Sequence, residues 1–223
     1  MKTLKLLAPC PIGEFRELYT VNSQGYRCPE FETIEWEKSI LMLGCSHTFG
    51  VGAADDCTVA AQLQLLLNEP VINLGQGATG YSFNWMNSTL LKRHGVRPKA
   101  VVYIWPDYSR QSIFKSYDLT SPELWGSWNL DSKADRNSTG IVLTTDEYQS
   151  AAMAHYYSEN LQVLWDCPVL QYSHCGVKPP HADWIKMMPH WIDVTPVDPL
   201  HPGIKTNIER AKQIASDLTQ WVA

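Results

Sequence analysis

Short apolar runs alternate with longer amphipathic stretches along most of this sequence, and that alternation constrains the fold more than any other feature. The first apolar run, residues 39–44, is typical of a strand buried on both faces. The stretch that follows at 58–67 has helical spacing, with Thr58 at the N-cap position. Strands that alternate with helices indicate βαβ units. The sequence therefore predicts an α/β fold, a three-layer α/β/α sandwich around a mainly parallel sheet.

The expected elements continue in the same alternation to the end of the chain. Expected strands cover residues 39–44, 71–74, 100–105, 168–172 and 189–194. Expected helices cover residues 58–67, 83–94, 146–165 and 203–222. Two regions stand outside this pattern: an irregular prelude at 1–38, and a polar insertion at 111–145 placed to fold over the site as a lid. The 223 residues are expected to form a single domain, 1–223.

Composition excludes several classes of protein. The chain has 18 Lys and Arg against 23 Asp and Glu, and this mild acidity argues against a nucleic-acid partner. No apolar run approaches the ~20 residues of a membrane span. The start of the chain is too short for a signal-peptide core of about 7–15 apolar residues. We therefore expect a cytoplasmic protein with no membrane partner, whose six cysteines, none in a C-x-x-C motif, are free thiols.

Four loops are expected to meet at one edge of the sheet, because ligand sites in parallel sheets lie beyond the carboxyl ends of the strands. These loops cover residues 44–52, 75–80, 105–111 and 195–203. Each carries polar or reactive side chains, so their convergence predicts the functional site.

Two of these loops hold a candidate nucleophile and a candidate base. Ser46 lies in a strand-to-helix turn, where the helix N-terminus favours developing negative charge. Asp198 and His201 are three residues apart, a spacing that allows a carboxylate to orient an imidazole acting as general base. Each also has an ordinary explanation, with Ser46 or Asp198 merely capping a turn. The presence of both together favours the catalytic interpretation.

Taken together, these motifs resemble the SGNH (GDSL-type) hydrolases, a family of serine esterases and enzymes that handle acyl groups. Residues 44–50 match the family's Gly-Asp-Ser-x-Thr-x-Gly block except at Cys45. Residues 73–75 resemble its Asn-x-Gly block, and residues 198–202 match Asp-x-x-His-Pro. Residues 21–27 are similar to an Asn-Ser-x-Gly-aromatic-Arg prelude found in some branches.

The resemblance implies a flavodoxin-like sheet and a division of roles in the site. Ser46 would be the nucleophile, His201 the base and Asp198 its orienting partner. The backbone N–H groups of Ser46 and Gly75 would form the oxyanion hole, in which each donor is worth about 2.7–4 kcal/mol of transition-state stabilisation. No cofactor is implied.

The sequence departs from the family at two places. Asp107 stands nearest the position of an Asn that donates a hydrogen bond to the hole, and an ionised carboxylate cannot donate one. Asp107 is then protonated, points elsewhere, for example toward Arg110, or is replaced by a donor among Tyr108, Ser109 and Gln111. Cys45 replaces the family's Asp; as a nucleophile it is disfavoured, because Ser46 holds the motif position.

The sequence disfavours two other kinds of site. Residues 75–80 fit the G-x-G-x-x-G pattern of dinucleotide binding, but Asp107, the candidate ribose acid, follows after 32 residues in place of the usual ~20. The group formed by His174, Cys175, His181 and His190 has no compact metal-ligand spacing, so no metal is expected.

The predicted function is a serine esterase or deacetylase acting on a small acyl ester, such as an O-acetylated carbohydrate. An O-acyltransferase with the same triad and a non-catalytic ligand-binding module are the alternatives. Expected substrate contacts are His47, Tyr108, Arg110, Trp125 and Trp128, the last two in the insertion, where aromatic faces suit sugar rings. The other tryptophans on or beside regular elements, Trp165, Trp191 and Trp221, are expected to pack.

Overall fold

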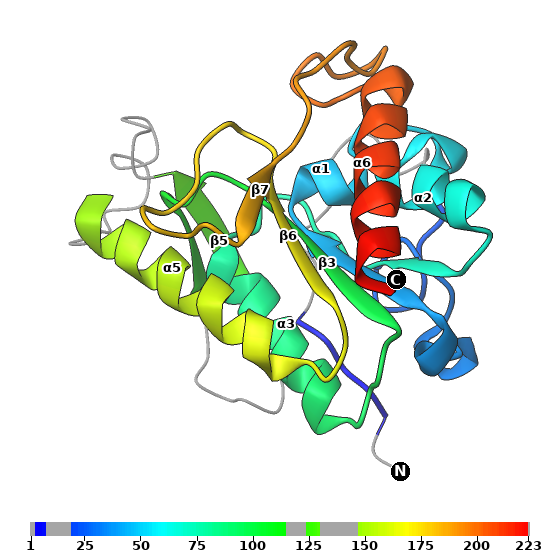
Figure 1. Cartoon of the computed structure of the whole chain (residues 1–223), viewed down its shortest axis with the longest axis horizontal. Coiled ribbons are helices and arrows are strands. Elements are labelled where there is room, and N and C mark those ends of the chain that lie inside the picture. Colours follow the sequence, from blue (N-terminus) through cyan, green and yellow to red (C-terminus); the bar gives the residue numbers. More distant parts are fainter. Residues whose placement is uncertain (1–2, 8–18, 115–123, 130–146, 223) are drawn as a thin grey trace.

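The centre of the molecule is a five-stranded parallel sheet with the order β2-β1-β3-β6-β7 (Figure 1). The computed structural model describes residues 3–7, 19–114, 124–129 and 147–222. Numbered among themselves along the chain, the five strands follow the order 2-1-3-4-5, which is the flavodoxin-like order. The predicted α/β class and parallel sheet are confirmed. The strands are β1 (Ile40–Gly44), β2 (Val71–Asn73), β3 (Ala100–Trp105), β6 (Val169–Ser173) and β7 (Ile185–Met187).

Helices cover both faces of this sheet, which gives the three expected layers (Figure 1). On one face α3 (Tyr81–Arg93) packs with α5 (Glu147–Leu164), and on the other α2 (Val59–Leu67) packs with α6 (Ile204–Val222). Successive strand residues point to opposite faces, so each strand contributes to two hydrophobic cores. In β1, for example, Leu41 joins the core under α3 and α5, and Met42 joins the core under α2 and α6.

The shorter elements lie in the loops and in the predicted insertion. α1 (Ser46–Phe49) directly follows β1, and the 3-10 turns are η2 (Phe31–Thr33), η3 (Trp36–Lys38) and η4 (Asp55–Cys57). β4 (Arg110–Phe114) and β5 (Leu124–Asn129) form a separate antiparallel pair, which the sequence pattern did not predict. The rest of the predicted lid, at 115–123 and 130–145, lies outside the described residues.

The prediction of a last strand at 189–194 is wrong. The fifth strand is β7, and its hydrogen-bonded partner is β6. Residues 189–194 form a loop in which Ile192 is 60% exposed, and Val194 makes only an isolated bridge to Pro202. The apolar residues that suggested a strand therefore face solvent and do not pack in a core. No helix in the described ranges has the length and apolar character needed to cross a bilayer.

Arg27, from the predicted prelude, anchors the turn that follows α1. Its side chain is almost fully buried, and its Nη1 donates to the Gly50 carbonyl at 2.8 Å while Nη2 donates to the Ala53 carbonyl at 2.7 Å. Its Nε donates to Asp55 Oδ1 at 2.7 Å. The guanidinium also lies over the Tyr19 ring, 4.6 Å from the centroid. One buried cation therefore fixes the backbone immediately after the segment that carries Ser46.

We predict that Arg27→Lys lowers the free energy of unfolding by about 3 kcal/mol, because an ammonium cannot reproduce the guanidinium fork that reaches two carbonyls and a carboxylate. Urea denaturation of the two proteins measures the loss. Lys38→Ala is the matched control, since the ion pair of Lys38 with Glu35 is exposed and is worth less than about 1 kcal/mol. Equal losses in the two variants would contradict the role given to Arg27.

Candidate active site

Ser46 is placed by the close approach of α1 to the end of β2. β1 is buried along its whole length and ends at Gly44, so that Cys45 precedes the helix in an extended conformation and Ser46 is its first residue. At Gly75 a Cβ atom would lie 2.4 Å from the Phe49 backbone nitrogen. Only a glycine at this position lets α1 pack directly on the loop after β2. Ser46 remains half-buried.

Asn73 and Gly75, from the Asn-x-Gly block, link the loop after β2 to α1. Asn73 Nδ2 donates to the Thr48 carbonyl at 2.9 Å, which ties the end of β2 to α1. Asn73 Oδ1 accepts the Gly75 N–H at 3.0 Å. The N–H expected to serve an oxyanion is therefore engaged with a neighbouring side chain.

Asp198 and His201 form the carboxylate–imidazole pair that their spacing suggested. His201 Nδ1 lies 2.6 Å from Asp198 Oδ2. The His201 side chain is 15% exposed and the Asp198 side chain is 14% exposed. The other carboxylate oxygen, Oδ1, accepts the Leu200 N–H at 2.9 Å. With a carboxylate at Nδ1, we assign the proton to that nitrogen, which leaves the Nε2 lone pair of His201 available as a base.

The loop that holds this pair packs against the turn after α1. Gly52 has φ +74°, and a Cβ there would lie 2.5 Å from Thr195 Oγ1 and 3.1 Å from Asp198 Cβ. Thr195 Oγ1 in turn donates to the Asp198 carbonyl at 2.7 Å. No hydrogen bond joins Ser46 Oγ to His201 within the described part of the chain. Catalytic hydrogen bonds are often long before substrate binds.

Two predicted residues at the end of β3 are engaged with their neighbours. Asp107 Oδ1 accepts the Ser109 N–H at 2.8 Å, so it acts as an acceptor. Tyr108 donates its hydroxyl hydrogen to Glu147 Oε1 at 3.0 Å, which directs that side chain toward α5.

Of the other predicted contacts, Arg110 lies near the site, since its charge lowers the pKa values of Cys45 and His174. The backbones of Trp125 and Trp128 belong to β5, but their side chains lie outside the described part of the structure.

A group of rings that sequence reasoning missed surrounds His47. The His47 ring stacks on His174 with centroids 3.6 Å apart, and the rings of Trp191 and His201 each lie 5.2 Å from it. Cys45 Sγ lies 3.3 Å from His174 Nε2. His47, His174 and Trp191 line a pocket of about 810 Å³ together with residues 187–190.

Trp191 and Trp221 were expected to pack, and this is wrong for both. Trp191 is 40% exposed at the pocket, and Trp221 is 61% exposed near the end of α6. A positional signal was present for His174, which directly follows the carboxyl end of β6. That signal applies to His174 and not to Trp191, which lies in the loop after β7.

The His47 and His174 rings of this group are uncharged at neutral pH. Burial, followed by the neighbouring His174 and Arg210, holds the pKa of His47 well below its ordinary value of 6.5. Burial, with Arg210 and Arg110, lowers the pKa of His174 to about 3. Burial raises the pKa of the Cys45 thiol, which therefore is no thiolate nucleophile. Among the described residues, no three His, Cys, Asp or Glu side chains gather closely enough to hold a metal ion.

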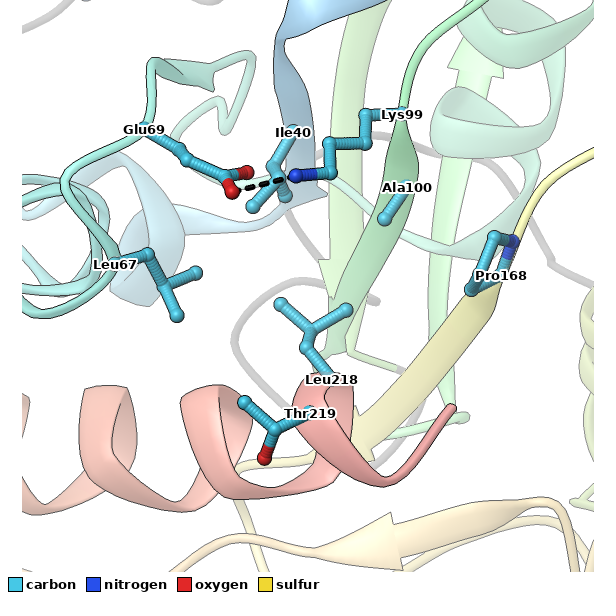
Figure 2. A pocket seen from close by; sticks show the side chains of 8 residues that line it. All are labelled: Ile40, Leu67, Glu69, Lys99, Ala100, Pro168, Leu218 and Thr219. Atoms are coloured by element: carbon cyan, nitrogen blue, oxygen red, sulfur yellow. Dashed lines mark hydrogen bonds and ion pairs between the residues drawn. The ribbon is translucent and has the colours of Figure 1, made fainter. Parts of the chain in front are cut away.

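A second pocket, of about 380 Å³, lies at the opposite edge of the sheet (Figure 2). It is lined by Ile40 and Ala100, which begin β1 and β3, and by Leu218 of α6. Figure 2 shows the Glu69–Lys99 ion pair at its rim. Because ligand sites of parallel sheets lie at the carboxyl ends of the strands, the pocket beside His47 is the candidate site.

We predict that the free energy of unfolding falls as the pH drops from 6.5 to 5. In this range the unfolded chain takes up protons at His47 and His174 while the folded chain does not, so stability rises with pH. The slope contributed by each histidine is at most about 1.4 kcal/mol per pH unit. Urea denaturation at several pH values measures it. His174→Gln should flatten the dependence, and an unchanged slope would contradict the assignment of a neutral buried ring.

Fold and site together define an α/β protein with a flavodoxin-like sheet, whose carboxyl edge carries a serine turn and an Asp–His pair. No family model matches the sequence, and no curated protein matches it, so the SGNH resemblance stays a prediction. Solved structures that resemble it include an acetyl xylan esterase from the rumen bacterium Butyrivibrio proteoclasticus, with 12% identity over 83% of this chain and a TM-score of 0.48.

A carbohydrate esterase family 2 enzyme with a carbohydrate binding domain, from Corynascus thermopiles (Myceliophthora fergusii), has 10% identity over 88% of this chain and a TM-score of 0.49. A family two carbohydrate esterase from Cellvibrio japonicus has 12% identity over 82% and a TM-score of 0.48. This chain spans 64%, 69% and 61% of the length of those three chains, in the order given. The function proposed below rests on the residues of the site and not on these likenesses.

Proposed function

We propose that the protein is a serine esterase that hydrolyses a small acyl ester through Ser46, His201 and Asp198. The observation that carries the proposal is the 2.6 Å contact between Asp198 Oδ2 and His201 Nδ1, in a loop packed against the turn that follows Ser46. A carboxylate that orients an imidazole is the device that converts a serine hydroxyl into a nucleophile.

In the proposed reaction, His201 Nε2 takes the proton of the Ser46 hydroxyl as its oxygen attacks the ester carbonyl carbon. The imidazolium that forms is stabilised by Asp198 and returns the proton to the departing alcohol, which leaves an acyl group on Ser46. Water then loses a proton to His201 and attacks this acyl group, releasing the acid and restoring the serine.

The oxyanion of both tetrahedral intermediates needs hydrogen-bond donors. The Ser46 N–H, at the first position of α1, has no intrahelical acceptor and is a suitable donor. The Gly75 N–H would have to share or leave its bond to Asn73 Oδ1. Because one lost donor typically costs about 100–1,000-fold in kcat, we propose a slow esterase.

The pocket beside His47 supports a substrate with both polar and apolar parts. Trp191 offers an aromatic face and Met188 an apolar surface, while the imidazoles offer hydrogen bonds. An acylated carbohydrate combines these features, and we propose one as the substrate class. Transfer of the acyl group to a sugar hydroxyl would use the same residues, with that hydroxyl in place of water.

A binding module without activity is the second candidate function. It is favoured by the local engagement of Asp107 with the Ser109 N–H and of Gly75 with Asn73, which removes two expected oxyanion groups. A fluorophosphonate probe separates the two functions, because it labels a serine only where a base activates it.

We predict that Ser46→Ala abolishes the hydrolysis of p-nitrophenyl acetate, with kcat/KM falling at least about 1,000-fold, and that it abolishes labelling by the fluorophosphonate. Release of p-nitrophenol and in-gel fluorescence measure the two effects. The control is Ser216→Ala, which removes an exposed hydroxyl on α6 far along the helix from the site. Hydrolysis that is equal in the wild-type protein and in Ser46→Ala would refute the esterase.

A further inference from the structure

Arg210 of α6 is a fully buried cation without a carboxylate partner in the described part of the chain. Its Nε and Nη2 are enclosed and make no hydrogen bond there. Burial lowers its pKa only to about 10, so the guanidinium keeps its charge at neutral pH. A buried, unpaired cation is costly, and such groups call for an explanation.

Among the described residues, the polar contact of Arg210 is with the residue that follows Ser46. Arg210 Nη1 lies 3.4 Å from His47 Nδ1. A guanidinium has donors only, so Arg210 donates and the Nδ1 atom of His47 accepts through its lone pair. The neutral His47 ring must then carry its hydrogen on Nε2.

In this form the Nε2 atom of His47 carries a hydrogen that can be donated. This atom makes no hydrogen bond to another described residue. His47 lines the 810 Å³ pocket with Trp191, and its ring centroid is 5.2 Å from that of His201. A donor that no described residue uses therefore lies beside the base of the proposed triad.

We propose that His47, fixed by Arg210 in its neutral Nε2–H form, donates a hydrogen bond to the ester substrate on the His201 side of the reacting carbon. The acceptor is the alcohol oxygen of the ester, which must lie near His201 to receive its proton. In the second step the oxygen of the attacking water occupies the same place. His47 thereby touches the substrate, and Arg210 acts as a positioning residue. The inference rests on the esterase function proposed above.

The surroundings keep this donor from becoming an acid. The charged and titratable groups that act on His47 are His174 after β6, Arg210 of α6, His201 in the loop before α6, and Arg110 of β4. The two arginines oppose a further positive charge, and the stacked His174 ring limits access to water. His47 therefore remains a neutral donor at neutral pH.

The form of the His47 ring can be tested without any assay of activity. In ¹⁵N NMR spectra of the labelled protein at pH 6 to 8, His47 should show the Nε2–H pattern. Arg210→Met, which removes the donor, should give a mixture of the two neutral forms, and Arg210→Lys, which keeps a donor, should retain the wild-type pattern. An Nδ1–H or doubly protonated His47 in the wild-type protein would overturn the proposal.

Two substitutions of His47 test the donation to substrate. In His47→Gln, Arg210 can donate to Oε1, which leaves the Nε2 hydrogens near the position of the imidazole Nε2–H. In His47→Asn the shorter amide cannot reach it. We expect kcat/KM for methyl acetate, an ester whose alcohol is a poor leaving group, to fall about 10–100-fold in His47→Asn and less than about 5-fold in His47→Gln.

Fluorophosphonate labelling of Ser46 and the melting temperature are measured on the same samples. Labelling and melting temperature close to wild type, with the expected difference between the two variants, support the proposal. Equal kcat/KM values in both variants, with Ser46 still labelled, overturn the role of His47 and leave the esterase standing. A wild-type protein that is neither labelled nor active overturns both.

Discussion

The guanidinium of Arg27 holds the backbone on which the rest of the site depends. Its bonds to the carbonyls of Gly50 and Ala53 fix the turn after α1, and Gly52 within that turn is in contact with the loop of Asp198. A change at Arg27 therefore acts on two loops whose residues are about 150 positions apart in the sequence. The turn after Ser46 and the loop of Asp198 and His201 are held together where the Gly52 backbone meets Thr195 and Asp198, and among the described residues no direct hydrogen bond joins Ser46 to His201.

Arg27 and Arg210 show two ways of burying the same cation. Arg27 satisfies its donors with carbonyls and Asp55, so its burial stabilises the fold. Within the described ranges, two nitrogens of Arg210 have no hydrogen-bond partner, and a third contacts an imidazole. An apolar side chain of the same volume would often be neutral or stabilising in its place. The cost is understandable only if the electrostatic effect on the neighbouring histidines is useful.

The parallel sheet and the Asp198–His201 pair were predictable because each depends on residues close in sequence. The apolar composition of residues 40–44 by itself indicates a buried strand. A spacing of three residues lets the Asp198 carboxylate contact the His201 imidazole. Trp191, His174 and Arg210 could not be assigned in this way, since their meeting at His47 depends on how α6 and the loops pack. β7 was misplaced because it is a three-residue strand with two exposed positions, and the neighbouring loop is the more apolar segment.

The engagement of Asp107 and Gly75 changes where catalytic hydrogen bonds must come from. In the proposed reaction the loss of an Asn donor weakens stabilisation of the oxyanion, which lies on the side of the carbonyl away from His201. A donor at His47 does not replace it, because His47 acts on the alcohol oxygen. The His47 donor would lower the barrier to a different event, the departure of the alcohol. An enzyme built in this way would favour esters whose alcohol is a poor leaving group held tightly in the pocket, as a sugar hydroxyl is, over simple activated esters.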